Sequence, residues 1–307
     1  MGRGSYTATD WTSLRSSKGF NNASTTYKEI FRNQCAESKF DSRYVGIREA
    51  RDNEDSMVST PIIIGFDVTA SMGYLAQELA TSSINLAITA IAKGGPVSNP
   101  QYLTAAIGDI KCDKTPLQVT QFESDIRIIE QLTQLHLEGG GGGNDGESYN
   151  LVWYFAAKHT AADCFEKRHG KGFLFTIGDD KCHPDLSVVE IARAFNDEVP
   201  YSLSSTEILE MAEEKYHVCH IHINDGSYES RQIMKDLRNS FPSRVTEIYR
   251  NDLHDILPYL ILSVMELRKG VAVNDILNSK PAELSSKLAR PLGFMINNNQ
   301  PGSALLF

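Results

Sequence analysis

The sequence predicts a doubly wound α/β fold, in which helices cover both faces of a mostly parallel sheet. Short apolar runs alternate with segments of helical spacing between residues 58 and 268. The first run, Pro61–Phe66, is apolar on both faces and ends directly at polar side chains, a pattern typical of a buried parallel strand. Leu117–Phe122 instead alternates in polarity, which predicts one antiparallel edge strand.

Each further element follows from its own local pattern. Tyr74–Lys93 has apolar residues at helical spacing, which predicts a helix directly after the first strand. Ser124 and Ser205 provide the starting signals for helices at 124–135 and 205–215. The remaining strands are expected at 102–109, 172–177, 216–223 and 245–249, and the remaining helices at 148–162, 186–195, 229–240 and 252–267.

The length of 307 residues suits either one large α/β domain with extensions or two small domains. We expect the domain at 58–268, an N-terminal extension at 1–57 that wraps around it, and a C-terminal tail at 269–307. Short helices are expected at 25–35 and 281–288. The extension is polar, but its many aromatic residues argue against pure disorder. Those rings could cover either the domain or a partner.

Charge and hydropathy argue against several classes of protein. Thirty basic against 39 acidic residues give a formal net charge of −9, which disfavours general affinity for nucleic acid. No apolar run reaches the length of a membrane span, and the N-terminus lacks the apolar core of a signal peptide. The five cysteines are scattered, as is typical of reduced thiols inside a cell. We therefore expect a cytoplasmic protein that does not enter a membrane.

One carboxylate and two hydroxyls follow the first strand, at Asp67, Thr69 and Ser71. Their spacing in a loop lets three side chains converge on one point. Ligands of open α/β sheets bind at the carboxyl ends of the strands, and a hard divalent cation such as Mg²⁺ prefers oxygen ligands. The same hydroxyls could instead cap the following helix. The spacing alone leaves both interpretations open.

Asp67-Val-Thr-Ala-Ser-Met-Gly73 resembles the metal-ion-dependent adhesion site of von Willebrand factor A (vWA) domains, whose first strand ends in Asp-x-Ser-x-Ser. Gly139–Glu147 lies where that family has its second metal loop. Gly172–Asp179 resembles the family's fourth strand, which ends on a metal-site Asp. Gly178–His183 is most similar to the bacterial, phage and alpha-kinase-associated branch. The resemblance implies a Rossmann-like vWA fold over residues 58–268.

The resemblance also implies a set of metal ligands from the first and third loops: Asp67, Thr69, Ser71 and Asp179. The family's second loop usually donates a Thr, which the glycine-rich run here lacks. Asn144, Asp145 or Ser148 must substitute, and we expect Asp145. An Asp ligand would hold the cation better but leave it a poorer electrophile for a partner carboxylate. The expected supporting residues around the metal are Asn144, Glu147, Ser148, Asp180 and His183.

Other patterns point to different chemistry. The glycine run satisfies a dinucleotide-binding pattern, but a homopolymer does so trivially and this one follows a helix. Cys182, His183 and the histidines of 216–223 could bind zinc, but they lack Cys-x-x-Cys or His-x-x-x-His spacing, so we interpret them as core or surface residues. Glu147 or Asp180 could act as a base on metal-bound water, which keeps a metal-assisted hydrolase open.

We expect a non-enzymatic module that binds Mg²⁺, or Mn²⁺ or Ca²⁺, and mediates metal-dependent contact with a protein partner. The partner would supply a carboxylate that completes the metal's ligand shell. Because the net charge is −9, that carboxylate should stand alone among basic or neutral residues. The alternatives are the hydrolase and a structural subunit of a larger bacterial or phage assembly with a purely structural metal. The sequence identifies neither the partner nor the oligomeric state.

Overall fold

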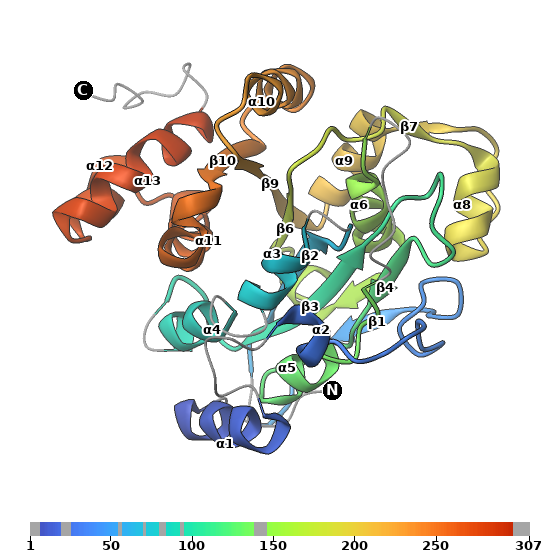
Figure 1. Cartoon of the computed structure of the whole chain (residues 1–307), viewed down its shortest axis with the longest axis horizontal. Coiled ribbons are helices and arrows are strands. Elements are labelled where there is room, and N and C mark those ends of the chain that lie inside the picture. Colours follow the sequence, from blue (N-terminus) through green and yellow to red (C-terminus); the bar gives the residue numbers. More distant parts are fainter. Residues whose placement is uncertain are drawn as a thin grey trace.

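The computed structural model describes residues 7–19, 26–54, 57–69, 72–79, 84–92, 95–137 and 146–296. Its main sheet has six strands in the order β10-β9-β6-β2-β3-β4 (Figure 1). The strands are β2 (Thr60–Asp67), β3 (Pro100–Ile107), β4 (Leu117–Val119), β6 (Gly172–Gly178), β9 (Tyr216–Asn224) and β10 (Val245–Tyr249). Only β4 runs antiparallel to its neighbour within this sheet. The predicted fold class and the antiparallel edge strand are therefore confirmed.

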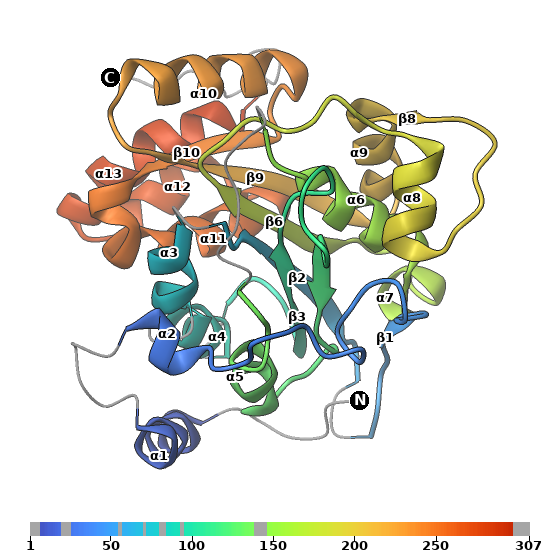
Figure 2. The same ribbon diagram turned by 45° about the vertical axis from the view of Figure 1, so that its right-hand side comes forward.

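Helices cover both faces of the sheet (Figure 2). One face packs against α3 (Gly73–Glu78), α4 (Ile84–Ala92), α5 (Arg127–Leu132), α11 (Leu253–Arg268), α12 (Val273–Asn278) and α13 (Ala282–Phe294). The other packs against α6 (Tyr149–Lys158), α7 (Asp163–Glu166), α8 (Val188–Phe195), α9 (Ser205–Glu213) and α10 (Tyr228–Ser240). The 3₁₀ helix η3 (Arg250–Asp252) links β10 to α11. None of the helices in the described part of the chain combines the length and apolarity needed to cross a membrane.

The central strand β2 shows why the sheet is doubly covered. All eight of its residues are buried. Side chains alternate along a strand, so Ile62 and Ile64 join the core on one face while Ile63 joins the core on the other. A strand in this position must be apolar on both sides, which explains the continuous aliphatic run of the sequence.

Two pairings of short strands were not predicted. β1 (Arg48–Ala50) pairs in parallel with β5 (Thr160–Ala162), and β7 (Asp185–Leu186) pairs antiparallel with β8 (Leu203–Ser204). The charged segment around β1 showed no strand pattern, and β5 falls at the end of the helix predicted at 148–162. Helix α6 ends earlier, at Lys158, because the following residues bond to a distant strand rather than continue the helical ladder.

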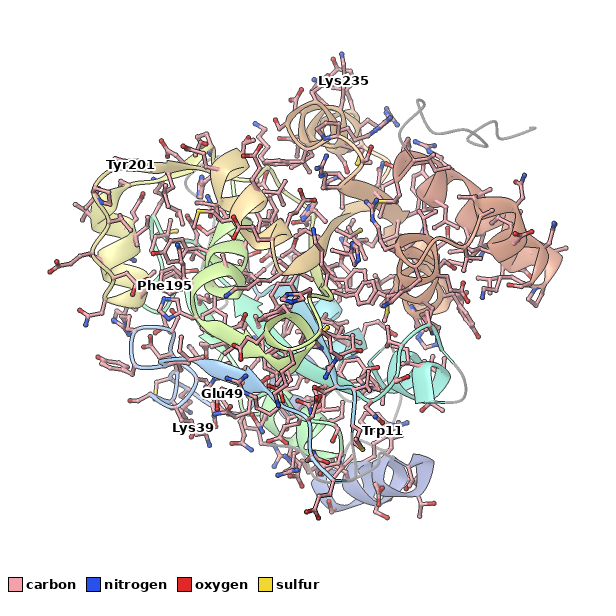
Figure 3. The ribbon with its side chains drawn as sticks, turned by 180° about the vertical axis from the view of Figure 1, so that it is seen from behind. Trp11, Lys39, Glu49, Phe195, Tyr201 and Lys235 are labelled. Atoms are coloured by element: carbon pink, nitrogen blue, oxygen red, sulfur yellow. The ribbon has the colours of Figure 1, made fainter. Side chains whose placement is uncertain are left out.

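The N-terminal segment places several side chains in the core of the domain. It contains α1 (Ala8–Lys18), which the sequence did not predict, and α2 (Tyr27–Ile30). Trp11, labelled in Figure 3, and Phe31 are buried in the same core cluster as β2, whereas Tyr44 is exposed. At the other end of the chain, α13 lies against β10, where Thr246 Oγ1 donates to the carbonyl of Pro291 at 2.7 Å. The domain boundaries at 57 and 268 stay predictions.

Candidate functional site

The order of the strands places a topological switch point at β2. Its neighbours are β3 and β6, which the chain adds on opposite sides, so the strand order reverses at β2. Open α/β sheets bind ligands at the carboxyl ends of the strands at such a point. The register pairs Asp67 with Ile107 and Phe66 with Ile177. Asp67 at the end of β2 therefore lies beside the end of β6, from which Asp179 follows directly. Two of the predicted metal-site carboxylates thus come from adjacent strand ends.

Asp67 is completely buried and only partly satisfied. Its Oδ1 accepts a hydrogen bond from the backbone N–H of Thr69 at 2.7 Å. Its Oδ2 is buried, and no described residue donates to it. Burial, together with the nearby charges of Asp179 and Asp180, raises the pKa of Asp67 to about 7, although hydrogen bonds from Thr69 oppose the rise. A buried carboxylate oxygen without a donor is costly, unless a cation outside the protein chain satisfies it.

Glu147 adds a second buried carboxylate to the same region. Its backbone N–H donates to the carbonyl of Lys181 at 2.7 Å, and the N–H of His183 donates to the carbonyl of Glu147 at 3.1 Å. These bonds hold the segment after the glycine run against the loop after β6. Glu147 Oε2 is buried and has no hydrogen-bond donor among the described residues. Burial raises the pKa of Glu147 to about 10, with further contributions from Asp67 and other carboxylates.

The half-buried Asp179 completes a cluster of carboxylates that repel one another. Burial raises the pKa of Asp179, the charge of Asp180 adds to this effect, and Arg250 opposes it. Charge repulsion together with buried oxygens that lack donors fits a site that holds a hard cation through oxygen ligands. In the described part of the chain, however, no three His, Cys, Asp or Glu side chains converge as metal ligands. A complete ligand set would therefore need hydroxyls or residues that are not described.

Several predicted site residues cannot be placed. Ser71, Asn144, Asp145 and the glycine run at 139–143 lie outside the described residues. Thr69 is described and buried next to Asp67. The choice of ligand from the second loop thus stays a prediction.

Ser148 and His183, both predicted to support the metal, meet at a carboxylate that was not predicted as a site residue, Asp109. His183 Nε2 lies 2.8 Å from Asp109 Oδ1, and Ser148 Oγ donates to the same oxygen at 3.3 Å. Ser148 Oγ also accepts from the backbone N–H of Ile110 at 2.9 Å. Asp109 is almost completely buried just beyond the end of β3. A carboxylate after the strand next to β2 was a detectable signal, because it follows the rule that identified Asp67.

Two histidines of β9, His220 and His222, are interior residues. His220 is buried and its Nδ1 lies 3.0 Å from Thr176 Oγ1. His222 is also buried, with Nε2 2.9 Å from Ser230 Oγ. Burial lowers the pKa of His220 to about 3 and that of His222 to about 4, so both are neutral near pH 7. Each of these two imidazoles forms a hydrogen bond with a hydroxyl of the protein itself.

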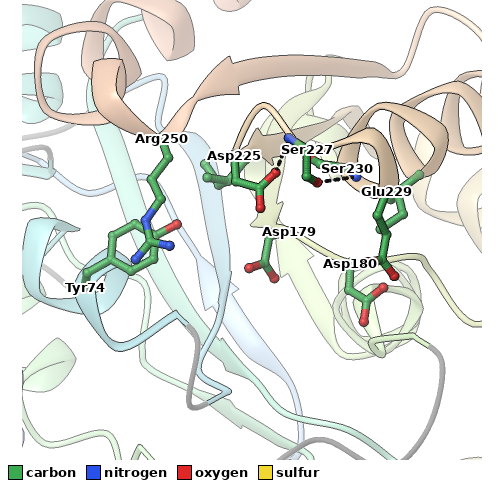
Figure 4. A pocket seen from close by; sticks show the side chains of 10 residues that line it. Tyr74, Asp179, Asp180, Asp225, Ser227, Glu229, Ser230 and Arg250 are labelled. Atoms are coloured by element: carbon green, nitrogen blue, oxygen red, sulfur yellow. Dashed lines mark hydrogen bonds between the residues drawn. The ribbon is translucent and has the colours of Figure 1, made fainter.

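A polar pocket of about 240 Å³ adjoins the carboxylate cluster (Figure 4). Asp179 and Asp180 form one side, and the loop between β9 and α10 forms another. In that loop Ser227 N–H donates to Asp225 Oδ1 at 2.8 Å. Arg250 is the cationic side chain among the described lining residues, and its guanidinium carbon lies 4.0 Å from the centroid of the Tyr74 ring. The charged groups among the described lining residues are therefore four carboxylates and one guanidinium.

No family model and no curated protein matches the chain. Among solved structures it is similar to the pilus adhesin SpaC from Lactobacillus rhamnosus GG in its open conformation, with 8% identity and a TM-score of 0.43 over 76% of this chain and 31% of SpaC. It is also similar to proximal thread matrix protein 1 from the mussel byssus, with 12% identity and a TM-score of 0.45 over 68% of this chain and 48% of that one.

A further similar structure is the vWF domain of the type V pili tip protein Mfa5 from Porphyromonas gingivalis. It shares 8% identity with this chain at a TM-score of 0.43, and the match covers 69% of this chain and 96% of the domain.

Proposed function

We propose that this chain is a vWA-like interaction module that holds Mg²⁺ between the ends of β2 and β6. The observation that carries the proposal is the buried Oδ2 of Asp67, which has no hydrogen-bond donor among the described residues and lies where β2 ends beside β6. Asp67 and Asp179 would hold the ion together with Thr69, Ser71 and Asp145. Bound Mg²⁺ would supply a positive charge that neutralises the carboxylate cluster and can accept one oxygen from outside.

That outside oxygen is the proposed means of recognition. A protein partner would offer one carboxylate to the metal. The acidic rim formed by Asp180, Asp225 and Glu229 would repel a partner surface rich in further carboxylates. The preferred partner surface therefore carries a single exposed Asp or Glu among basic or neutral residues.

The function is tested by capturing a partner with the immobilised protein in Mg²⁺ and in EDTA. We expect one protein to be retained by the wild type only in Mg²⁺, and to be lost with Asp67→Asn. The matched control is Asp225→Asn, which removes the same charge from the exposed rim but leaves the proposed ligands in place. Retention that is the same in EDTA, or with Asp67→Asn, would contradict metal-dependent recognition.

The second loop provides a prediction that separates metal affinity from partner affinity. Asp145→Thr restores the hydroxyl that vWA domains usually have there and removes one negative ligand. We expect this variant to bind free Mg²⁺ more weakly, about tenfold for a loss near 1.4 kcal/mol, and to bind the partner more tightly because the ion is more electrophilic. Calorimetry of both affinities checks this. Weaker binding of both metal and partner would indicate that the metal only pins the loops together.

Hydrolysis is the less favoured function because the buried side chains Asp109, Ser148 and His183 do not form the arrangement of a nucleophile and its base. Asp109 accepts hydrogen bonds from both Ser148 and His183, whereas in a catalytic triad the imidazole stands between the carboxylate and the nucleophile. We expect no turnover of phosphoester or peptide substrates in Mg²⁺ above the rate without protein. Turnover that survives repurification and disappears with Glu147→Gln, but not with the exposed Glu229→Gln, would establish the hydrolase instead.

A further inference from the structure

A second polar pocket lies at the opposite edge of the sheet. It has a volume of about 240 Å³ and forms where β9 begins and where α9 and α11 end. Its polar lining residues are Lys171, Glu213, His217, Ser243, Arg244 and Arg268. Lys171 directly precedes β6 and Asp179 directly follows it, so this pocket and the candidate metal site are separated by the length of that strand, roughly 26 Å at 3.3 Å per residue.

The charges in this pocket do not balance. Arg244 forms two hydrogen bonds with Glu213, from Nε and Nη2, each at 2.9 Å. Glu213 is thereby neutralised, while Lys171 and Arg268 remain positive. Burial lowers the pKa of His217 to about 4, so this side chain is neutral near pH 7. The lining therefore carries a surplus of two positive charges in a protein whose net charge is −9.

Arg268 lines this pocket without a carboxylate partner among the described residues. It is half-buried, and its Nη2 donates to the backbone carbonyl of Ser243. No carboxylate in the described part of the chain forms an ion pair with it. Burial lowers the pKa of Arg268, and the nearby charge of Glu213, which acts in the opposite direction, does not offset this effect. Buried charges in proteins are normally paired, and a guanidinium has five N–H donors, so Arg268 can still bind an external anion.

We propose that this pocket binds a phosphate group. The planar fork of Arg268 matches two oxygens of a tetrahedral oxyanion, and Lys171 adds a point charge at the rim. A pocket of this size is smaller than the roughly 300–1,000 Å³ of sites for drug-sized ligands. It suits the free phosphate ion or the terminal phosphate of a small monoester. The proposal is independent of the function assigned to the metal site.

The test is calorimetric titration of the full chain with inorganic phosphate in EDTA, against potassium chloride at equal ionic strength. We expect phosphate to bind and chloride not to bind. Lys171→Gln and Arg268→Gln should each weaken binding about tenfold or more, the factor that follows from losing one hydrogen bond to a charged group. Asp67→Asn should bind phosphate as the wild type does, which keeps this result separate from the metal site.

Lys235→Gln is the matched control, since Lys235 is exposed on α10 (Figure 3), lies outside the pocket and loses the same charge. Lys171 is exposed, so its variant remains informative if Arg268→Gln fails to fold. A parallel titration with O-phosphoserine distinguishes a monoester from the free ion, and binding of either supports the proposal. Phosphate binding that does not exceed that of chloride, or that Lys171→Gln weakens no more than Lys235→Gln does, would overturn it.

Discussion

Saturating Mg²⁺ is expected to raise the melting temperature of the wild type by about 5 °C and to leave that of Asp67→Asn unchanged. A ligand at about 100 times its Kd stabilises the folded state by about 2.7 kcal/mol, and a chain of this size gains about 2 °C for each kcal/mol. Asn preserves the shape of the side chain and the hydrogen bond from Thr69. It removes the charge that would hold the cation. Differential scanning calorimetry with and without Mg²⁺ measures the effect.

The control for this experiment is Asp225→Asn, which changes the net charge equally and alters only the exposed rim of the adjoining pocket. It should keep the full Mg²⁺-dependent rise. Equal rises in Asp67→Asn and wild type would show that Mg²⁺ does not act through Asp67, and the proposed metal site would then be wrong.

The second large effect is expected from Gly178→Ala. A Cβ added to Gly178 would lie 2.0 Å from the hydroxyl oxygen of Tyr149, far inside van der Waals contact. Tyr149 is completely buried at the start of α6, so it has no free space into which to move. We expect a loss of roughly 1–3 kcal/mol in the free energy of unfolding, typical of an overpacked core. Urea denaturation monitored by tryptophan fluorescence measures it.

Gly46→Ala is the matched control, because the added Cβ at this exposed position meets nothing within 4 Å. Its free energy of unfolding should stay within about 0.5 kcal/mol of the wild type. Since Asp179 follows Gly178 directly, Gly178→Ala should also weaken Mg²⁺ binding. If both glycine variants have wild-type stability, Tyr149 is not fixed against the end of β6.

The spacing of apolar residues predicted much of the fold, because buried positions recur at regular intervals along a helix or a strand. The aliphatic run of β2 had to be a strand covered on both faces, and 245–249 was predicted with the bounds that β10 has. Pairing between distant segments left no such local pattern. β1 contains a buried Arg48, whose guanidinium donates to the carbonyl of Val119 at 3.0 Å. A charged residue is not typical of a buried strand, so β1 could not be predicted without its pairing partner β5.

The sequence by itself determined the fold class and which strand ends carry the carboxylates, because hydrophobic periodicity and residue identity are local properties. Tertiary structure alone decided which polar groups meet. Ser148 precedes β6 in the sequence and His183 follows it, yet both form hydrogen bonds with Asp109. Likewise, the surplus charge of Arg268 becomes visible only once folding has paired Glu213 with Arg244. Such pairings depend on distances of a few ångström between elements, which no pattern along one chain encodes.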